Sequence, residues 1–214
     1  MMKRSEKNPW LSIPASDYET HMGESGARQL SMLSEVFKNL LDEFSPESVA
    51  VLGCATGNGF EHIRAEITRL LVGVDINPKY LEVARQRHCE NIPGMQLFCS
   101  DIKNIELAPR SFDLVSCGLF FEHTDPELVV AKAFRWLKPG GVLGTVLQLA
   151  NDSGNTVTDT GVDSIRSLES VTRLVSPDQL TQYAEKAGFR LLSKERLDLD
   201  TGKSFNTLVY RMKS

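Results

Sequence analysis

The sequence predicts an α/β fold with a doubly wound, mostly parallel sheet of seven strands, the last of which runs antiparallel. From residue 48 onward, short apolar runs alternate with helical patterns, which is typical of a parallel sheet covered by helices on both faces. A glycine-rich turn directly follows the first apolar run. The last two apolar runs are joined by a turn around residues 201–203. This turn is too short for a crossover helix, so these strands should pair antiparallel.

The chain has 214 residues, which is enough for one well-buried domain. We therefore expect a single domain over residues 1–214. Its parts are an N-terminal arm and helix (1–44), a central core (48–149), an insertion or lid (150–175), and a C-terminal helix with a strand pair (176–214). Residues 1–22 show no regular pattern, whereas residues 24–44 have helical spacing of apolar side chains. An insertion as long as 150–175 after a strand is usually functional or mobile.

Within the core, apolar runs predict strands at residues 49–52, 70–75, 95–99, 112–117 and 142–149. Helices are predicted at residues 60–68, 78–88 and from 124 to about 137. Asn77-Pro78 is a suitable start for the second of these helices. Thr124 and Glu127 fit a capping box at the start of the third, and residues 138–141, Lys-Pro-Gly-Gly, end it.

The C-terminal part predicts one more helix and two strands. Ser176 and Gln179 fit a capping box, and Gly188 ends the helix that follows. The strands are predicted at residues 189–199 and 205–212.

The turn after the first strand is the most informative segment. It contains Gly53, Gly57 and Gly59, and glycine allows a tight turn and close approach of a ligand to the backbone. A strand, turn and helix in this order bring backbone N–H groups and a helix N-terminus close to a ligand. The dinucleotide pattern G-x-G-x-x-G fits poorly, because Ala55 and Asn58 stand where its second and third glycines should be.

Residues 52–59 read LGCATGNG, which resembles motif I of class I S-adenosylmethionine-dependent methyltransferases, commonly LGCGTGNG. Four further segments resemble motifs of this family in the family's order: residues 73–81, 100–102, 112–117 and 137–143. On these five motifs the chain is identified as a member of the family. The resemblance implies a Rossmann-like methyltransferase fold, an enzyme, and S-adenosyl-L-methionine as cofactor.

The resemblance also implies which residues bind the cofactor. In the family, the acid at the position of Asp75 binds the ribose hydroxyls, and the acid at the position of Asp101 meets the adenine amino group. The expected cofactor-binding residues are Gly53, Cys54, Ala55, Thr56, Gly57, Asn58, Gly59, Asp75, Ile76, Asn77, Ser100, Asp101, Ile102 and Gly118. The spacing agrees, since Asp75 lies 22 positions after Gly53, close to the separation at which an acid after the second strand reaches a ribose.

Two positions depart from the family pattern. Val51 stands where the family usually has an acid that helps to hold the methionine end of the cofactor, so the ammonium group needs another acceptor, such as the Gly53 carbonyl. Ala55 replaces the middle glycine of motif I. We expect its methyl group to be tolerated if the backbone keeps a negative φ.

Methyl transfer requires a general base only if the acceptor arrives protonated. The candidate catalytic residues are Glu122 and His123, which follow the fourth strand, and Tyr18 in the N-terminal arm. His123 is a candidate base near neutral pH. Tyr18, together with Asp17 and His21, is a candidate lid residue whose ring could contact the sulfonium.

The remaining expectations concern partners and location. A net charge of −4, no clear Lys/Arg cluster, and a loop after the fourth strand that lacks the family's Asn/Asp-Pro-Pro-aromatic motif favour a small-molecule acceptor over nucleic acid. The four scattered histidines form no recognisable metal site. The start of the chain has no apolar signal segment, no run suggests a membrane span, and the four cysteines form no C-x-x-C pair, so we expect a cytoplasmic protein. The sequence leaves the oligomeric state open, with a homodimer as one option.

Two other functions are kept open. A nicotinamide-dependent oxidoreductase would need a proton donor such as Tyr-x-x-x-Lys, but Tyr183 is followed at that spacing by Ala187. A non-catalytic module that keeps the fold as a scaffold or ligand sensor is also open, because Val51 replaces the family acid and no base is secure.

Overall fold

The computed structural model describes residues 8–150 and 156–213. Within them, seven strands form one sheet in the order β3-β2-β1-β4-β5-β7-β6. The strands are β1 (Ser48–Leu52), β2 (Leu70–Asp75), β3 (Met95–Cys99), β4 (Phe112–Gly118), β5 (Leu137–Gln148), β6 (Phe189–Asp198) and β7 (Ser204–Met212). The segments 1–7 and 151–155 of the predicted arm and insertion lie outside the described residues.

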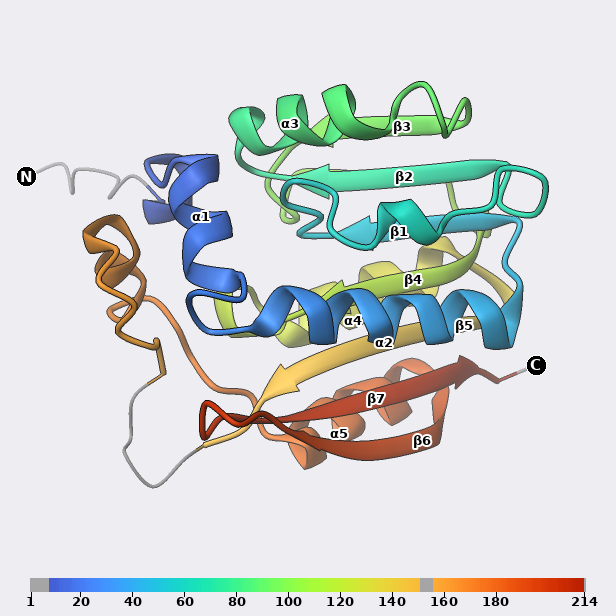
Figure 1. The fold of residues 1–214 in the computed structure, drawn as a ribbon. Coiled ribbons are helices and arrows are strands. Elements are labelled where there is room, and N and C mark those ends of the chain that lie inside the picture. Colours follow the sequence, from blue (N-terminus) through green and yellow to red (C-terminus); the bar gives the residue numbers. More distant parts are fainter. Residues whose placement is uncertain (1–7, 151–155, 214) are drawn as a thin grey trace, which may run out of the picture.

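The sheet is parallel except for β7, which pairs antiparallel with both β5 and β6. The predicted α/β fold class and the antiparallel last strand are therefore confirmed. From β1 the chain winds outward to β2 and β3, then returns to place β4 on the other side of β1. Ligands of such sheets bind at this reversal, beyond the carboxyl ends of the strands. In Figure 1, α1 (Ala15–Met22) and the segment that contains the short helix η4 (Asp163–Leu168) lie at this edge of the sheet.

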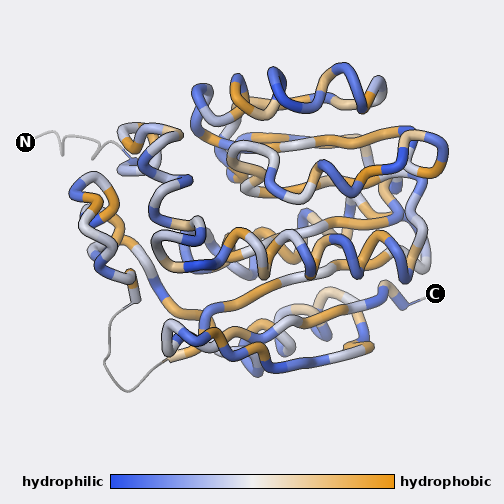
Figure 2. Tube along the Cα trace, viewed as in Figure 1, coloured by the Kyte–Doolittle hydropathy of each residue, from blue (hydrophilic) through white to orange (hydrophobic). Residues whose placement is uncertain are grey.

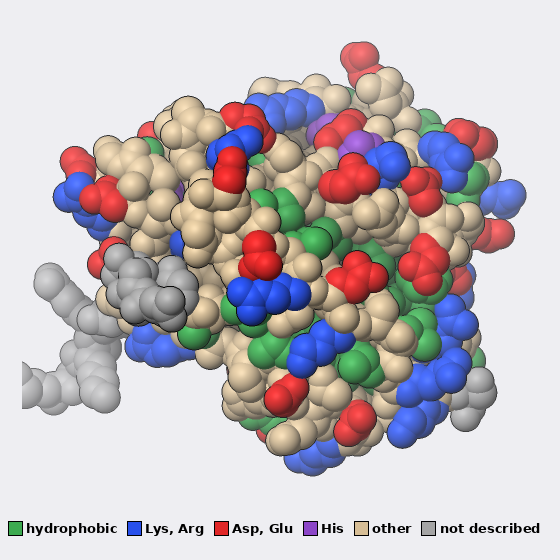
Figure 3. All heavy atoms as spheres, turned by 60° about the horizontal axis from the view of Figure 1, so that its bottom comes forward, with side chains coloured by type: hydrophobic (Ala, Val, Ile, Leu, Met, Phe, Trp, Pro, Cys, Tyr) green, Lys and Arg blue, Asp and Glu red, His purple; other side chains and the backbone are tan. Residues whose placement is uncertain are grey.

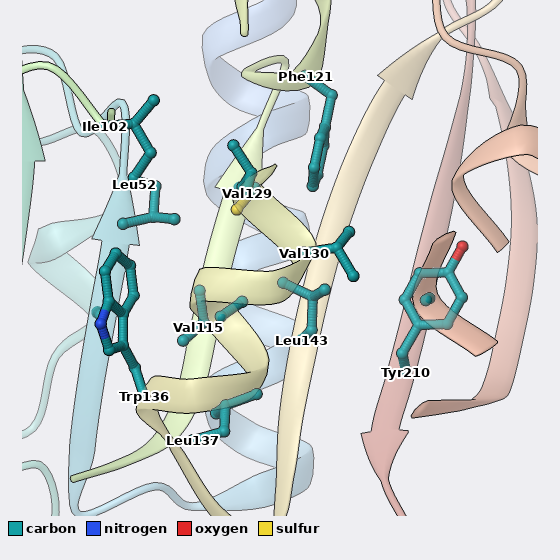
Figure 4. Close-up of a cluster of buried hydrophobic side chains, with 14 of the residues drawn as sticks. Leu52, Ile102, Val115, Phe121, Val129, Val130, Trp136, Leu137, Leu143 and Tyr210 are labelled. Carbon is teal, nitrogen blue, oxygen red and sulfur yellow. The ribbon is translucent and has the colours of Figure 1, made fainter. Parts of the chain in front are cut away.

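Helices cover both faces of the sheet. α2 (Gln29–Phe44) and α3 (Pro78–His88) pack on one face, and α4 (Pro126–Trp136) and α5 (Pro177–Ala187) on the other. Hydrophobic residues follow the strands, and hydrophilic residues lie mainly on the outer sides of the helices (Figure 2). Figure 4 shows the larger core, where Trp136 of α4 packs near Leu52 of β1.

The helix ends largely follow the sequence signals. The Asn77 side chain accepts a hydrogen bond from the Lys79 N–H at the start of α3, and Ser176 accepts one from the Gln179 N–H at the start of α5. Gly188 ends α5 at φ 108°. The predicted cap of α4 is wrong by one residue, because Asp125 rather than Thr124 accepts the N–H groups of the first turn. A carboxylate is the better N-cap here because it can accept more than one N–H bond.

The N-terminal segment is more ordered than its pattern predicts. It contains the short helix η1 (Pro9–Leu11) and the helix α1 (Ala15–Met22), although residues 1–22 show no regular pattern. The eight residues of α1 are too few for a clear period, and contacts with the rest of the fold stabilise the helix. α2 begins at Gln29 and not near residue 24, because the chain turns between Gly23 and Arg28, whose φ is 56°.

The predicted helix at residues 60–68 is also wrong. Only one 3₁₀ turn, η2 (Phe60–His62), forms there. Phe60 and Ile63 are both buried, whereas the Thr68 hydroxyl donates to the Pro46 carbonyl and draws the chain toward the start of β2. β5 starts earlier than predicted, because Leu137 pairs with Phe112 of β4 directly after α4 ends; the pairing then shifts register and resumes at Val142.

The remaining features of the fold are its surface charges, the exposure of its cysteines and the length of its helices. On the face shown in Figure 3, acidic and basic side chains are interspersed, with hydrophobic side chains between them. Cys54 and Cys117 are buried, whereas Cys89 and Cys99 are exposed. No helix in the described ranges is both long and apolar enough to cross a lipid bilayer.

Gly188 gives a direct test of the packing between α5 and α4. Its φ is 108°, and an added Cβ would lie 2.9 Å from the Phe134 ring. Gly188→Ala should lower the free energy of unfolding by about 2–4 kcal/mol, through backbone strain and overpacking. Gly202→Ala is the matched control, because its φ is 80° with nothing within 4 Å. We expect it to cost about 1 kcal/mol. Urea unfolding that gives equal losses for both variants would contradict this account.

Candidate active site

A cavity opens beyond the carboxyl ends of β1, β2, β3 and β4. Eight of the predicted cofactor-binding residues line it: Gly53, Ala55, Asp75, Ile76, Ser100, Asp101, Ile102 and Gly118. All three candidate catalytic residues, Tyr18, Glu122 and His123, line the same cavity. The parallel strand ends and α1 thus bring residues that are up to 105 positions apart in the sequence to one place.

The glycine-rich turn contributes space more than hydrogen bonds. The N–H groups of Gly53 and Cys54 donate to the Val74 carbonyl, and the N–H of Ala55 donates to Asp75. These three amides are therefore occupied within the protein and, contrary to the sequence expectation, are not free to bind a ligand. No α-helix follows the turn, so no helix N-terminus points at the ligand either. Gly53 is nonetheless required, since a Cβ would lie 2.5 Å from the Phe120 ring.

Ala55 contradicts the expectation of a negative φ. Its φ is 45°, in the left-handed region. Such a conformation costs a residue with a Cβ about 1–2 kcal/mol. The hydrogen bond of 2.9 Å from its N–H to Asp75 Oδ2 helps to hold this conformation.

Asp75 joins the first two strands of the core at the cavity. Its Oδ2 accepts the Ala55 N–H, and its Oδ1 accepts the Asn77 N–H at 2.8 Å. Burial raises the pKa of Asp75, and hydrogen bonds from backbone N–H groups oppose this shift. Each carboxylate oxygen can accept a further hydrogen bond. The geometry therefore leaves acceptor capacity for a ligand with two hydroxyl groups.

Six predicted cofactor-binding residues do not line this cavity. Cys54 and Asn58 line a smaller adjoining cavity beneath α2, together with Val51. The Thr56 hydroxyl donates to Glu19, and the Asn77 side chain donates to the carbonyls of Trp10 and Ile13. Cβ atoms on Gly57 and Gly59 would meet the side chains of His88 and Phe37. These residues shape the turn or anchor the N-terminal segment.

α1 covers the cavity and is tied to the core on both sides. Glu19 accepts from the Thr56 hydroxyl at 2.7 Å and from Arg87 of α3 at 3.0 Å. On the other side, Asp17 accepts from Ser164 of η4 (Asp163–Leu168) at 2.7 Å.

Aromatic rings form the wall on the α1 side. The Tyr18 ring lies 5.1 Å from the Tyr80 ring, and the Trp10 ring lies 4.9 Å from His123. Burial raises the pKa of Tyr18, so its phenol is protonated at neutral pH and is a poor base.

Glu122 and His123 are held by the short helix η3 (Phe121–His123). Phe121 is fully buried, and in Figure 4 its ring points into the core beside α4. Glu122 is only 3% exposed; its Oε1 accepts the Gln148 N–H at 2.7 Å, and its Oε2 has no partner among the described residues. Burial raises the pKa of Glu122 to about 7. Burial lowers the pKa of His123 to about 4, so the imidazole is neutral at pH 7 and Glu122 is the stronger base.

Sequence reasoning missed several residues of this cavity. Gln148 ends β5, and Lys203 lies in the turn between β6 and β7; both are buried and line the cavity. A polar residue at the end of a parallel strand, as at Gln148, is a signal that could have been used. Nothing in the sequence around Lys203 distinguishes it from a solvated turn lysine. No group of three His, Cys, Asp or Glu side chains in the described ranges is arranged to hold a metal ion.

The comparisons with known proteins agree with this geometry. The family described as "Methyltransferase domain" matches residues 50–145. The chain is similar to a ubiquinone biosynthesis O-methyltransferase of Coxiella burnetii, with 26% identity over 173 residues and 74% of each chain covered. It is 29% identical over 177 residues to the enzyme of that name from Thiobacillus denitrificans, covering 78% of this chain and 73% of the relative.

This chain is a class I S-adenosylmethionine-dependent methyltransferase. Its fold also matches the N-methyltransferase NodS of Bradyrhizobium japonicum in complex with S-adenosyl-L-homocysteine, with a TM-score of 0.69 and 14% identity over 97% of this chain and 100% of that one. The predicted family, fold and cofactor are confirmed. The enzyme uses S-adenosylmethionine as its methyl donor.

The raised pKa of Glu122 predicts a pH-dependent stability. The fold favours its protonated form, so the full stability is present below the unfolded pKa, near 4.5, and is lost as pH rises through about 7. Relative to the wild type, Glu122→Gln should therefore gain up to about 3 kcal/mol of unfolding free energy at pH 8 and nothing at pH 4. Urea unfolding across this range, with the exposed change Glu195→Gln as control, measures the difference. If the difference in unfolding free energy between the two proteins did not change with pH, the raised pKa of Glu122 would be disproved.

Proposed function

We propose that this methyltransferase acts on a small molecule that binds between the strand ends and a lid formed by α1 and the segment around η4. The observation that supports this proposal best is the buried carboxylate of Glu122, a residue that lines the same cavity as Asp75 and whose Oε2 has no hydrogen-bond partner among the described residues. One cavity therefore has room for a cofactor at its β2 side and for an acceptor at its β5 side. A covered cavity of this kind suits a small acceptor better than a polymer.

The residues present fit S-adenosylmethionine. Asp75 would accept the ribose hydroxyls, Asp101 and Ile102 would contact the adenine, and Gly53 would leave room for the methionine part. The bound cofactor supplies a methyl group that a sulfonium makes electrophilic. Val51 packs with apolar residues of the core, so it offers no acceptor for the ammonium group. The Gly53 carbonyl remains our candidate acceptor.

Glu122 is our candidate general base. Its pKa of about 7 lies close to neutral pH, where a base combines a useful ionised fraction with a useful proton affinity. The names of the two sequence relatives, both O-methyltransferases, support an oxygen atom as the methyl acceptor. An acceptor hydroxyl would need to lose its proton, which gives the base its role. His123 would then serve as a neutral wall of the cavity beside Trp10.

We also infer a cytoplasmic enzyme that acts on neither nucleic acid nor a membrane. Four free cysteines are compatible with a reducing compartment, and a net charge of −4 disfavours a polyanionic partner. A homodimer is retained as an expectation from the sequence, to be tested by sedimentation.

Asp75→Ala tests the cofactor assignment. Removing the carboxylate should weaken binding of S-adenosyl-L-homocysteine at least about 100-fold in calorimetry, because two charge-assisted hydrogen bonds are lost. Asp113→Ala is the matched control, since Asp113 also accepts a backbone N–H, from Ser48 at 2.9 Å, but at the opposite end of β4. It should bind with wild-type affinity. Circular dichroism checks that both variants are folded, and wild-type affinity of folded Asp75→Ala would refute the assignment.

A further inference from the structure

A buried glutamate, Glu122, and a buried lysine, Lys203, both line the acceptor end of the cavity. Gln148 contacts both, because its backbone N–H donates to Glu122 Oε1 at 2.7 Å and its side-chain Oε1 accepts from Lys203 Nζ at 3.0 Å. The Gln148 side-chain amide also donates to the Thr156 carbonyl at 2.7 Å, which fixes its orientation. Gln148 thus holds the carboxylate and the ammonium in fixed positions on one cavity wall.

Lys203 reaches the cavity from the turn between β6 and β7. Only 6% of this residue is exposed, which is rare for a lysine unless it is paired. Besides Gln148, its ammonium donates to the Thr156 carbonyl at 2.9 Å. Burial lowers the pKa of Lys203 to about 8, and the negative charge of Glu122 opposes this shift. At neutral pH the cavity wall therefore contains a mostly charged ammonium, and Glu122, with a pKa of about 7, is about half ionised.

Three neighbouring titratable groups do not supply charge. His21 of α1 has a pKa lowered to about 4 by burial and by the charge of Lys203, and His123 of η3 is also neutral at pH 7. The Cys117 thiol of β4 has a pKa raised by burial and by Glu122. The pair formed by Glu122 and Lys203 therefore dominates the electrostatics of the acceptor end.

We propose that the methyl acceptor carries an ionisable hydroxyl group, as in a phenol or an enol, and that Lys203 selects it by binding its oxygen while Glu122 takes its proton. A hydroxyl can donate to the unpartnered Glu122 Oε2 and accept from Lys203 at the same time. A protonated amine can only donate, and the ammonium of Lys203 repels it. A carboxylate can only accept, and Glu122 repels it. This inference rests on the proposed function and names the substrate class for the same site.

The proton transfer and the methyl transfer balance without any further reactant. The O–H bond of the acceptor breaks, its proton moves to Glu122 Oε2, and the electron pair stays on the oxygen. That oxygen then forms the bond to the methyl carbon while the carbon–sulfur bond breaks and leaves its electron pair on sulfur. Lys203 acts by stabilising the negative charge on the oxygen before the bond forms.

The test uses 4-nitrophenol, whose ionised form absorbs visible light, with the enzyme saturated by S-adenosyl-L-homocysteine. Titration should show the bound probe with a pKa below that of the free probe. Lys203→Met should weaken binding of the ionised probe about 10- to 100-fold, whereas Lys203→Arg should stay within about threefold of wild type. Lys194→Met, a change on exposed β6, should have no effect. 4-Nitrobenzylamine should bind at least about tenfold more weakly than the phenol.

The outcomes separate this inference from the proposed function. Calorimetry with S-adenosyl-L-homocysteine alone should give the same affinity for wild type and for Lys203→Met. With that affinity intact, an unchanged pKa of the probe, no binding of the probe, tighter binding of the amine, or an unaffected Lys203→Met would each overturn the role of Lys203. If the wild-type protein did not bind S-adenosyl-L-homocysteine at all, the proposed cofactor site would be overturned instead. Transfer of labelled methyl to phenols and not to matched benzylamines would support the proposed acceptor class.

Discussion

The carboxylate of Asp75 is the interaction on which the site depends most. It accepts N–H groups from two segments, the glycine-rich turn at Ala55 and the loop after β2 at Asn77, and so fixes the distance between them. The N–H groups of Gly53, Cys54 and Ala55 are already bonded within the protein, which is why we propose this carboxylate as the main polar contact of the cofactor. That division suits a cofactor whose reactive centre is a cation. A phosphate would need free backbone N–H groups, and those of Gly53, Cys54 and Ala55 are already bonded within the protein.

The second constraint is the reversal of strand order beside β1, where the chain returns from β3 to add β4 on the other side. Because β1 and β4 are adjacent and parallel, the turn after β1 and the loop after β4 open at the same edge. The buried Phe121 then fixes η3 against the core, which leaves Glu122 beside Gln148 at the end of β5. The fold holds a carboxylate out of water at that position, and the cost of this burial appears as the raised pKa of Glu122.

The sequence predicted the parts of the fold in which local signals and tertiary packing agree. Apolar runs bounded by turns located the seven strands, and the caps at Asn77 and Ser176 are where the sequence expects them. It failed where tertiary contacts decide the outcome. α1 forms because its residues pack on the core, and residues 60–68 form one 3₁₀ turn because Phe60 and Ile63 must both be buried over a short connection.

The residues of the site also divide into those that local sequence signals identify and those that only tertiary contacts reveal. Asp75 and Asp101 could be found because they follow strands in recognisable motifs. Lys203 could not, because its contact with Gln148 depends on the way the β6–β7 turn folds back onto β5. The protonation state of a side chain could also not be predicted from the sequence. His123 looks like a neutral-pH base until burial is known, whereas burial gives that property to Glu122.

We propose above all that the Asp75 carboxylate accepts the ribose hydroxyls of the cofactor, while the glycine-rich turn leaves room for its methionine part. A crystal structure of the full chain with S-adenosyl-L-homocysteine tests it most directly. We expect both ribose hydroxyls within hydrogen-bond distance of the Asp75 carboxylate and the adenine beside Asp101 and Ile102. A ligand bound elsewhere, or a ribose turned away from Asp75, would contradict the account.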